Sequence, residues 1–295
     1  MRILVTGGSG FIGSHTVKLL LLEGHFVRIL DLNRPSFVHE NLEYFQGDIL
    51  SKSDCMKATL GVDWVLHLAA YSRSGPSTSM WKECLTTNIV GSMNILDASR
   101  QSDVKKFVYA GSATYYGNLA GIQRIEDPPD LLNFYGVSKY TGEEITNQFS
   151  KFFQLSTINL RYFNVYGPGQ PIDGAYGLVI GIFAKAYKDN VGVDIHGTGE
   201  QRRDFVHVTD VARANLAALQ SHQSAKTYNV GSGTNISIND LALHFNLKTK
   251  HVTGRIGDAA ETLADIVATR LELGWSPTIS LKSGITDLMN QQSVF

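Results

Sequence analysis

Three glycines near the amino terminus constrain the fold more than any other feature of this chain. Gly7, Gly10 and Gly13 separate a short apolar run at 3–5 from a longer one at 11–22 that has helical spacing. A glycine-rich turn between a strand and a helix lets backbone N–H groups approach a pyrophosphate and places that anion at the helix amino terminus. The stretch therefore predicts the first strand–helix unit of a dinucleotide-binding sheet.

The residues that follow support the same interpretation. A second apolar stretch at 26–31 ends in Asp31, which stands 18 residues after Gly13. An acidic residue about 20 residues beyond the glycines binds the adenosine ribose in such folds, and its charge disfavours a 2′-phosphate. Asp31 therefore favours NAD over NADP, although Arg34 leaves some room for the phosphorylated form. A purely structural glycine turn in another α/β protein is the weaker alternative.

Apolar strands and amphipathic helices alternate through the first half of the chain. Further strands are expected at 44–49, 64–70, 106–112 and 155–163, with helices at 81–101 and 133–153. This alternation predicts an α/β fold with a Rossmann-like, doubly wound parallel sheet.

After residue 167 the segments become shorter and richer in glycine. The change predicts a smaller α/β carboxyl-terminal lobe that binds substrate. We expect an NAD-binding domain at 1–167, to which 204–232 returns, and the smaller lobe at 168–203 and 233–295.

Composition argues against several other classes of protein. With 26 Lys+Arg and 27 Asp+Glu the net charge is −1, so electrostatics gives no reason to expect nucleic-acid or membrane binding. No apolar run approaches the roughly 18 residues of a membrane span, and no signal peptide is expected. Cys55 and Cys84 lack metal-ligand spacing, so we expect no metal site and two reduced, buried thiols in a cytoplasmic protein.

Tyr135 and Lys139 are the main candidates for chemistry. They stand four residues apart in the predicted helix 133–153, so they share one helical face. A nearby ammonium favours the phenolate and lowers the pKa of a tyrosine. A Tyr-x-x-x-Lys pair is common by chance among 12 tyrosines, but this pair follows a strand that ends at Ser112. Together the three residues predict proton transfer coupled to hydride transfer at a nicotinamide.

Other polar side chains are harder to interpret. His67, inside an apolar strand, is expected to be a satisfied core residue rather than a catalyst. Asn88 either donates toward the neighbouring strand ends or satisfies local backbone. Arg202, Arg203 and Arg255 are candidates for a second anionic site, because guanidinium groups suit phosphate oxygens.

Taken together, the motifs resemble the extended short-chain dehydrogenase/reductase family, specifically its NAD-dependent nucleotide-sugar epimerases and dehydratases. The matching segments run almost from end to end: 6–13, 47–49, 67–70, 87–88, 111–117, 135–139, 160–168, 203–210, 228–232 and 255–258.

The resemblance implies roles for individual residues. Those implied for cofactor binding are Gly7, Gly10, Phe11, Ile12, Gly13, Asp31, Asp48, Ile49, Leu68, Ala69, Ala70, Asn88, Tyr135, Lys139 and Tyr162. The implied catalytic set is Ser112, Tyr135 and Lys139. The implied substrate contacts are Ser112, Asn164, Val179, His196, Arg203 and Arg255, of which Asn164, Arg203 and Arg255 hold the diphosphate. His196 replaces an aromatic residue found in many relatives.

Within the family the chain is most similar to UDP-hexose 4-epimerases. In 4,6-dehydratases an Asp-Glu pair follows the catalytic Ser or Thr, and UDP-glucuronate decarboxylases carry a Glu there; here Ala113 and Thr114 follow Ser112. The implied reaction is transient oxidation at C4 by NAD with Tyr135 as acid and base, rotation of the 4-keto sugar, and hydride return. The alternatives are a 4-ketoreductase or 4,6-dehydratase of the same family, or a non-catalytic NAD-sensing or nucleotide-sugar-binding protein.

Two finer expectations follow from the resemblance. Thr262 stands where glucose- and galactose-restricted relatives have a bulky residue. The smaller side chain leaves room for an N-acetyl group, so UDP-N-acetylhexosamines are expected to be accepted in addition to UDP-hexoses. The helices at about 80–101 and 133–153 correspond to the dimer contact of relatives. Both carry more apolar residues than one core-facing stripe needs, so a homodimer is expected.

Overall fold

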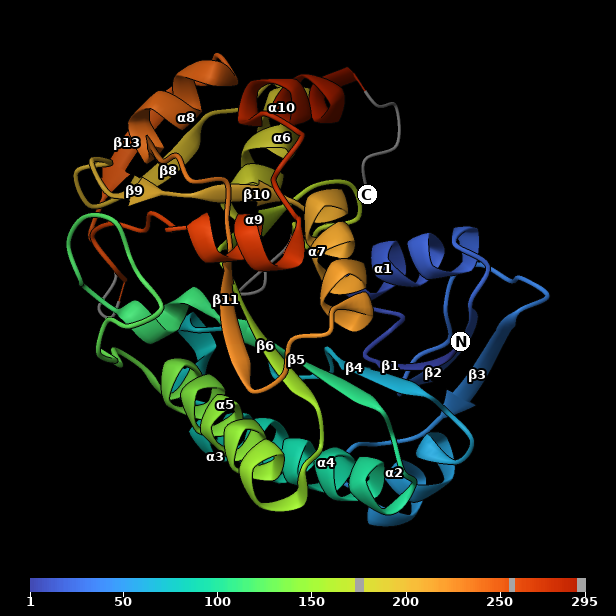
Figure 1. Ribbon diagram of the computed structural model, residues 1–295. Helices are drawn as coiled ribbons and strands as arrows, with labels where there is room; N and C mark the ends of the chain where they lie inside the picture. The colour runs from blue at the N-terminus through green and yellow to red at the C-terminus, as the bar shows by residue number, and fades with distance from the viewer. Residues whose placement is uncertain (173–177, 255–257, 291–295) are drawn as a thin grey trace.

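The computed structural model describes residues 1–172, 178–254 and 258–290 (Figure 1). A seven-stranded parallel sheet lies at its centre, in the order β11-β6-β5-β4-β1-β2-β3. The strands are β1 (Arg2–Thr6), β2 (Phe26–Asp31), β3 (Leu42–Gln46), β4 (Trp64–His67), β5 (Lys106–Ser112), β6 (Thr157–Tyr162) and β11 (Lys226–Val230). This order is doubly wound, and the predicted α/β class is confirmed.

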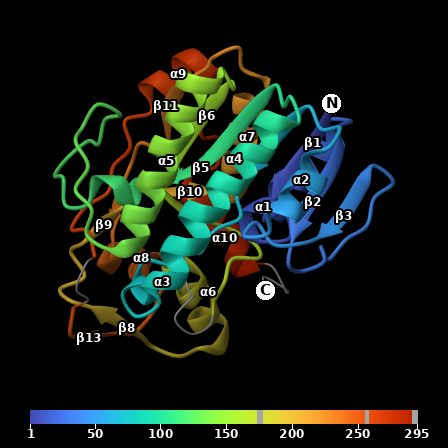
Figure 2. The same cartoon turned by 90° about the horizontal axis from the view of Figure 1, so that it is seen from below.

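Helices cover both faces of the sheet. The α-helices in the described part of the chain are α1 (Phe11–Leu22), α2 (Lys52–Thr59), α3 (Trp81–Leu85), α4 (Gly91–Gln101), α5 (Phe134–Phe153), α6 (Val179–Asp189), α7 (Val208–Gln220), α8 (Ile238–His244), α9 (Val267–Leu273) and α10 (Leu281–Asn290). On one face α1 packs against α7, while α2, α4 and α5 lie side by side on the other (Figures 1 and 2). Within the described residues, none of these helices is long and apolar enough to cross a membrane.

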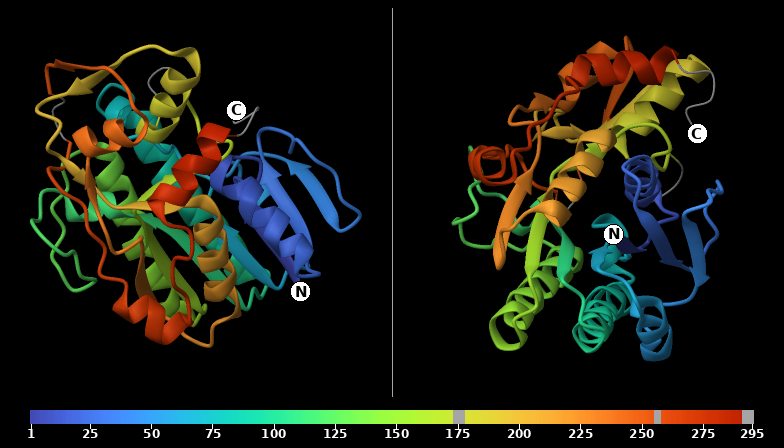
Figure 3. Two further views of the ribbon diagram at one scale, coloured as in Figure 1. Left: turned by 90° about the horizontal axis from the view of Figure 1, so that it is seen from above. Right: turned by 45° about the vertical axis from the view of Figure 1, so that its right-hand side comes forward.

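The apolar core has three parts. One fills the space between the sheet and the helices α1 and α7, and a second lies between the sheet and α2, α4 and α5. The third belongs to the smaller lobe, where α6, α8 and α10 pack together, and Figure 3 shows α6 and α10 side by side in yellow and red. Cys55 and Cys84 are buried free thiols, as expected.

The chain leaves the large sheet after β6. The remaining strands are β7 (Asn164–Tyr166), β8 (Val193–His196), β9 (Arg202–Arg203), β10 (Phe205–His207), β12 (Ile236–Ser237) and β13 (Thr249–Val252). They form three two-stranded sheets, β7 with β10, β8 with β13 and β9 with β12. The chain then returns to the main sheet through α7 and β11, and β11 pairs with β6. The domain boundaries themselves stay a prediction.

The helix expected over 81–101 is interrupted by a π-turn at Thr86–Val90. Asn88 in this turn accepts from the backbone N of Tyr71 at 2.7 Å and donates to the Tyr71 carbonyl at 2.9 Å. Its amide also donates to Ser138 Oγ on α5 at 2.8 Å. Asn88 therefore satisfies backbone, and the wider turn lets it join the loop after β4 to helix α5.

His67 is a satisfied core residue, as expected. Its Nδ1 lies 2.7 Å from Thr6 Oγ1 and its Nε2 lies 3.0 Å from Ser92 Oγ. Burial lowers the pKa of His67 to about 3, so the ring is neutral at physiological pH. Because the Ala69 amide donates to the same Thr6 hydroxyl at 3.1 Å, this chain of hydrogen bonds fixes the end of β4 beside the end of β1.

Candidate active site

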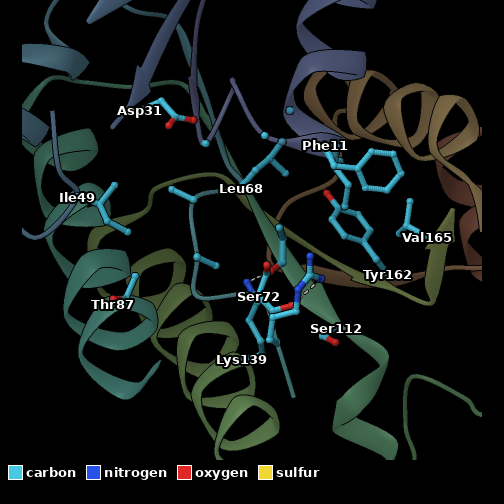
Figure 4. A pocket seen from close by; sticks show the side chains of 18 of the residues that line it. Phe11, Asp31, Ile49, Leu68, Ser72, Thr87, Ser112, Lys139, Tyr162 and Val165 are labelled. Carbon is cyan, nitrogen blue, oxygen red and sulfur yellow. Dashed lines mark hydrogen bonds between the residues drawn. The ribbon is translucent and has the colours of Figure 1, made fainter. Parts of the chain in front are cut away.

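A cavity of about 560 Å³ opens where the carboxyl ends of the sheet strands meet the smaller lobe (Figure 4). The glycine-rich turn and Asp31 line one end, and Ser112, Tyr135 and Lys139 line the other. This position is the crevice in which doubly wound sheets bind their ligands.

The glycine turn has the shape that a pyrophosphate requires. Gly7 has φ +69°, and a Cβ there would lie only 2.7 Å from the backbone N of Ala69. A Cβ on Gly13 would collide with the carbonyl oxygen of Gly7, so α1 can start against the turn only with glycine there. Gly10 caps α1 without a side chain, which leaves first-turn N–H groups for an anion. These residues fit a dinucleotide.

Two carboxylates lie at the far end of this cavity. Asp31 accepts from the backbone N of Ser9 and of Asn33, each at 3.0 Å, which fixes its carboxylate beside the glycine turn. Asp48 accepts from the backbone N of Leu50 at 2.9 Å, and Ile49 follows it on the cavity wall. Both acids are placed to accept hydrogen bonds from a ligand as well.

The candidate proton-transfer residues meet at the other end. Asn133 caps α5 by accepting from the Gly136 amide at 2.9 Å, so the helix starts just before Tyr135. Lys139, one turn further on, donates from Nζ to the carbonyl oxygen of Ala110 at 2.8 Å. Ser112 ends β5, and its Oγ accepts from the amide of Thr114 at 3.2 Å.

Burial dominates the electrostatics at this end of the cavity. Burial raises the pKa of Tyr135, opposed by hydrogen bonding to Ser112 and by the Arg73 guanidinium. Lys139 Nζ is bonded to the Ala110 carbonyl oxygen, and its expected effect on the tyrosine pKa stays a prediction. Burial lowers the pKa of Lys139 itself to about 8.

A second cavity of about 150 Å³ adjoins the first at Ser112. Thr114, Asn164, Arg203 and Thr262 are among its lining residues. Burial lowers the pKa of the Arg203 guanidinium, which also donates to the carbonyl oxygen of Arg202 at 2.9 Å. An arginine and an amide next to the candidate catalytic set suit a phosphate-bearing substrate.

Asn164 is more constrained than the prediction assumed. Its Nδ2 donates to the Asp204 carbonyl at 2.8 Å and to Thr262 Oγ1 at 3.0 Å. Both amide hydrogens are therefore engaged, and a bond to a diphosphate requires the release of one of them. Thr262 Oγ1 also accepts from the Asp204 amide at 3.0 Å, which fixes this small side chain in the cavity wall.

Several expected contacts lie away from the cavity walls. Asn88 is buried behind the wall, and Val179 and His196 line neither cavity. His196 Nδ1 instead lies 3.0 Å from the Thr253 carbonyl oxygen. Arg202 is engaged by Asn235, whose Oδ1 lies 2.8 Å from its Nε. Arg255 lies outside the described residues.

Other lining residues were not foreseen. Thr87, which neighbours Asn88 in the π-turn, lines the first cavity, and so does Ser72 from the loop after β4 (Figure 4). Arg73, next in that loop, lines it as well. Ser74 reaches the second cavity. Ser72, Arg73 and Ser74 belong to the segment 69–76, which follows β4. Its irregular conformation has no periodicity from which side-chain directions could be deduced.

The fold and this site define a dinucleotide-dependent enzyme of the short-chain dehydrogenase/reductase class. The strand order is that of a dinucleotide-binding sheet, the glycine turn and Asp31 line one end of its cavity, and the candidate reacting residues Ser112, Tyr135 and Lys139 line the other. The chain belongs to the NAD dependent epimerase/dehydratase family, whose model matches residues 3–231.

Comparisons with individual proteins support the same family. The UDP-glucose 4-epimerase of Erwinia amylovora is 31% identical over 99% of this chain and 98% of its own. Among solved structures, the Thermotoga maritima UDP-glucose 4-epimerase with UDP-glucose is similar with a TM-score of 0.93 and 31% identity, over 98% of this chain and 97% of that one. A UDP-N-acetylglucosamine 4-epimerase from Methanobrevibacter ruminantium, in complex with UDP-N-acetylmuramic acid, has a TM-score of 0.89 and 29% identity over 97% of each chain.

Proposed function

We propose that this chain is an NAD-dependent nucleotide-sugar 4-epimerase that acts on UDP-hexoses or UDP-N-acetylhexosamines. One observation carries the proposal: Ser112, Tyr135 and Lys139 line one cavity, while Ala113 and Thr114 occupy the positions that would carry acids in a dehydratase. The names of the relatives support the same reaction and both classes of sugar.

The cofactor would lie along the first cavity. The turn of Gly7, Gly10 and Gly13 would hold its pyrophosphate, and Asp31 would accept from the adenosine ribose. The remaining proposed contacts are Phe11, Ile12, Asp48, Ile49, Leu68, Ala69, Ala70, Tyr135, Lys139 and Tyr162. Once bound, NAD supplies the acceptor that takes a hydride from sugar C4 and later gives it back.

The protein's own task is to move one proton at the sugar 4-hydroxyl. Tyr135 accepts that proton as the C4 hydrogen leaves, and returns it when the opposite face of the 4-keto sugar is reduced. Ser112 hydrogen-bonds the same oxygen and orients it, while Arg73 stabilises the phenolate. Lys139, tied to Ala110, fixes the turn of α5 that carries the tyrosine. The reaction is balanced because the proton and hydride removed are both restored.

We further propose that two copies associate through α3, α4 and α5. Trp81 and Phe134 stack with ring centroids 5.9 Å apart, yet remain 42% and 39% exposed. Val90 at the end of the π-turn and Met93 on α4 add exposed apolar area. A cytoplasmic location is proposed as well, since Cys55 and Cys84 are free thiols.

The experiment that tests the function uses the purified protein with no cofactor added. UDP-N-acetylglucosamine, UDP-glucose and UDP-glucuronate are supplied in turn, and the anomeric and H4 protons are followed by NMR. We expect the galacto-configured product to accumulate to equilibrium without stoichiometric change in NADH. Turnover that begins only when NADPH and a 4-keto sugar are supplied would instead identify a ketoreductase.

A further inference from the structure

A buried ion pair lies one helical turn beyond Lys139. Arg161 on β6 is 4% exposed and Glu143 on α5 is 3% exposed. Arg161 donates from Nη2 to Glu143 Oε1 at 2.7 Å and from Nε to Oε2 at 3.1 Å, a two-point contact. Tyr135, Lys139 and Glu143 follow one another at intervals of four residues. The pair therefore anchors the same face of α5 that carries the candidate proton-transfer residues.

The same guanidinium also anchors the turn that follows Ser112. Its Cζ lies 3.5 Å from the ring centroid of Tyr115, and its Nη1 donates to the Tyr116 hydroxyl at 2.8 Å. Tyr116 donates in turn to Asn229 Oδ1 on β11 at 2.7 Å. Both tyrosines belong to the 3-10 turn Ala113–Tyr116, which starts directly after Ser112. Arg161 therefore contacts both structural units that carry the reacting hydroxyls.

Stability alone is a weak reason for this arrangement. Apolar residues of similar volume usually replace a buried ion pair without loss of stability, because both charges must be desolvated. What a two-point guanidinium contact adds is a defined geometry between the groups that it joins. Arg161 lines neither cavity, so it has no direct contact with a ligand in either of them.

We propose that Arg161 is a positioning residue that sets the separation between the Ser112 hydroxyl and the Tyr135 phenol, an inference that rests on the proposed function. The ion pair with Glu143 attaches Arg161 to α5, and the contacts with Tyr115 and Tyr116 attach it to the turn after Ser112. Loosening either contact moves Ser112 relative to Tyr135. An error of about 1 Å in such an arrangement costs up to roughly a hundredfold in rate.

The arrangement has a consequence for pH dependence. Hydrogen bonding to Ser112 opposes the effect of burial and so lowers the pKa of Tyr135. When Ser112 moves away, the pKa of Tyr135 rises and a smaller fraction is ionised at a given pH. The acid limb of the kcat profile then shifts to higher pH, an effect that a purely structural ion pair would not produce.

The test compares three variants of the full-length holoenzyme. Arg161→Lys keeps the charge and loses the two-point contact, while Tyr116→Phe keeps the ion pair and loses one hydroxyl. Arg28→Lys is the matched control, because Arg28 also pairs with a glutamate, Glu43 at 2.9 Å. Its other bonds go to the carbonyl oxygens of Ala58 and Leu60, away from α5 and from the turn after Ser112. For Arg161→Lys we expect kcat to fall about tenfold to a hundredfold, KM for the UDP-sugar to stay within about twofold, and the acid limb to shift to higher pH. Tyr116→Phe should show smaller changes in the same direction, and Arg28→Lys none.

A purely structural role for the Arg161–Glu143 pair predicts a different result. If Arg161→Lys lowers Tm while the folded enzyme keeps its kcat and pH profile, the pair is structural and the inference is wrong. A substrate-free measurement separates this outcome from failure of the proposed function. Ultraviolet titration, taken as the difference from Tyr135→Phe, reports the pKa of Tyr135 without turnover. An unchanged Tyr135 pKa in Arg161→Lys overturns the inference, whether or not the wild-type protein epimerises a UDP-sugar.

Discussion

Lys139 Nζ lies 2.8 Å from the carbonyl oxygen of Ala110, two residues before Ser112 on β5. This hydrogen bond links helix α5 to the strand that carries the candidate catalytic serine. The Arg73 guanidinium adds a positive charge that lowers the pKa of Tyr135 against the effect of burial. A residue outside the Tyr-x-x-x-Lys motif therefore contributes to the electrostatics of the candidate site.

Tyr135→Phe tests the acid and base assignment. The variant lacks the only hydroxyl proposed to move the proton, so kcat should fall by about 10²- to 10⁴-fold. Its ring keeps the packing, and bound NAD should stay near wild-type levels when it is released by denaturation and quantified. Substantial residual epimerisation, measured by NMR, would mean that a residue other than Tyr135 moves the proton. A non-catalytic sensor would be indifferent to the change.

Lys139 gives the protein a pH-dependent stability. Its pKa is about 8 in the folded chain, below the ordinary value of 10.5, because burial penalises the charged form. Between these values the unfolded chain binds more protons than the folded one, so stability rises with pH. Relative to Lys139→Met, the wild-type protein should therefore gain stability from about pH 8 to about pH 10.5. Urea unfolding without cofactor, at several pH values, measures the difference; parallel curves would contradict it.

Gly13→Ala should abolish cofactor retention. The added methyl group would collide with the Gly7 carbonyl oxygen and displace α1 from the turn. We expect bound NAD to be lost and Tm to fall, measured by absorbance of the purified protein and by calorimetry. Gly254→Ala is the control, because among the described residues its Cβ would come no closer than 3.7 Å to an atom beyond its chain neighbours. Normal NAD content in Gly13→Ala would contradict the dinucleotide assignment of the turn.

Thr262→Tyr tests the room available to an acetamido group. The larger side chain would fill part of the second cavity, so kcat/KM for UDP-N-acetylglucosamine should fall by about tenfold or more, while UDP-glucose is retained. Thr262→Val preserves the volume and removes only the hydroxyl that accepts from Asp204 and Asn164. Equal losses on both sugars in Thr262→Tyr would mean that volume at this position does not select between them.

The proposed dimer contact predicts a change of mass. Trp81→Glu places a charge in the exposed apolar patch on α3 and should give monomers at micromolar concentration, measured by light scattering after size-exclusion chromatography. Leu271→Glu, at a 79% exposed position on α9, should leave the mass unchanged. Identical masses for the wild type and both variants would place the association elsewhere or exclude it.

Much of the fold could be predicted because it rests on local patterns. The run 3–5, the three glycines and Asp31 reflect short-range rules of strand, turn and helix, and the doubly wound α/β class follows from the alternation of strands and helices. The reacting set was also accessible, since Tyr135 and Lys139 share a helix whose phase is set by spacing alone.

The remainder depended on contacts between distant segments. The hydrogen bond from Lys139 to the Ala110 carbonyl and the effect of Arg73 on the pKa of Tyr135 both arise from tertiary packing. Sequence periodicity does not encode such contacts. The same is true of Asn164, whose amide hydrogens are taken up by Asp204 and Thr262. The sequence shows which side chains stand at these positions, but it does not show which partner each of their hydrogen bonds goes to.

The π-turn at Thr86–Val90 gives the helix one residue more than a regular α-helical path would use. Each α-helical residue advances the side-chain direction by about 100°. Deleting one residue from this turn would therefore swing Trp81 around the helix axis, away from its stacking partner Phe134. The extra residue therefore rotates the side chains before the π-turn relative to those after it. As a result Asn88 faces inward while Trp81 faces the exposed apolar patch on the same run of helix.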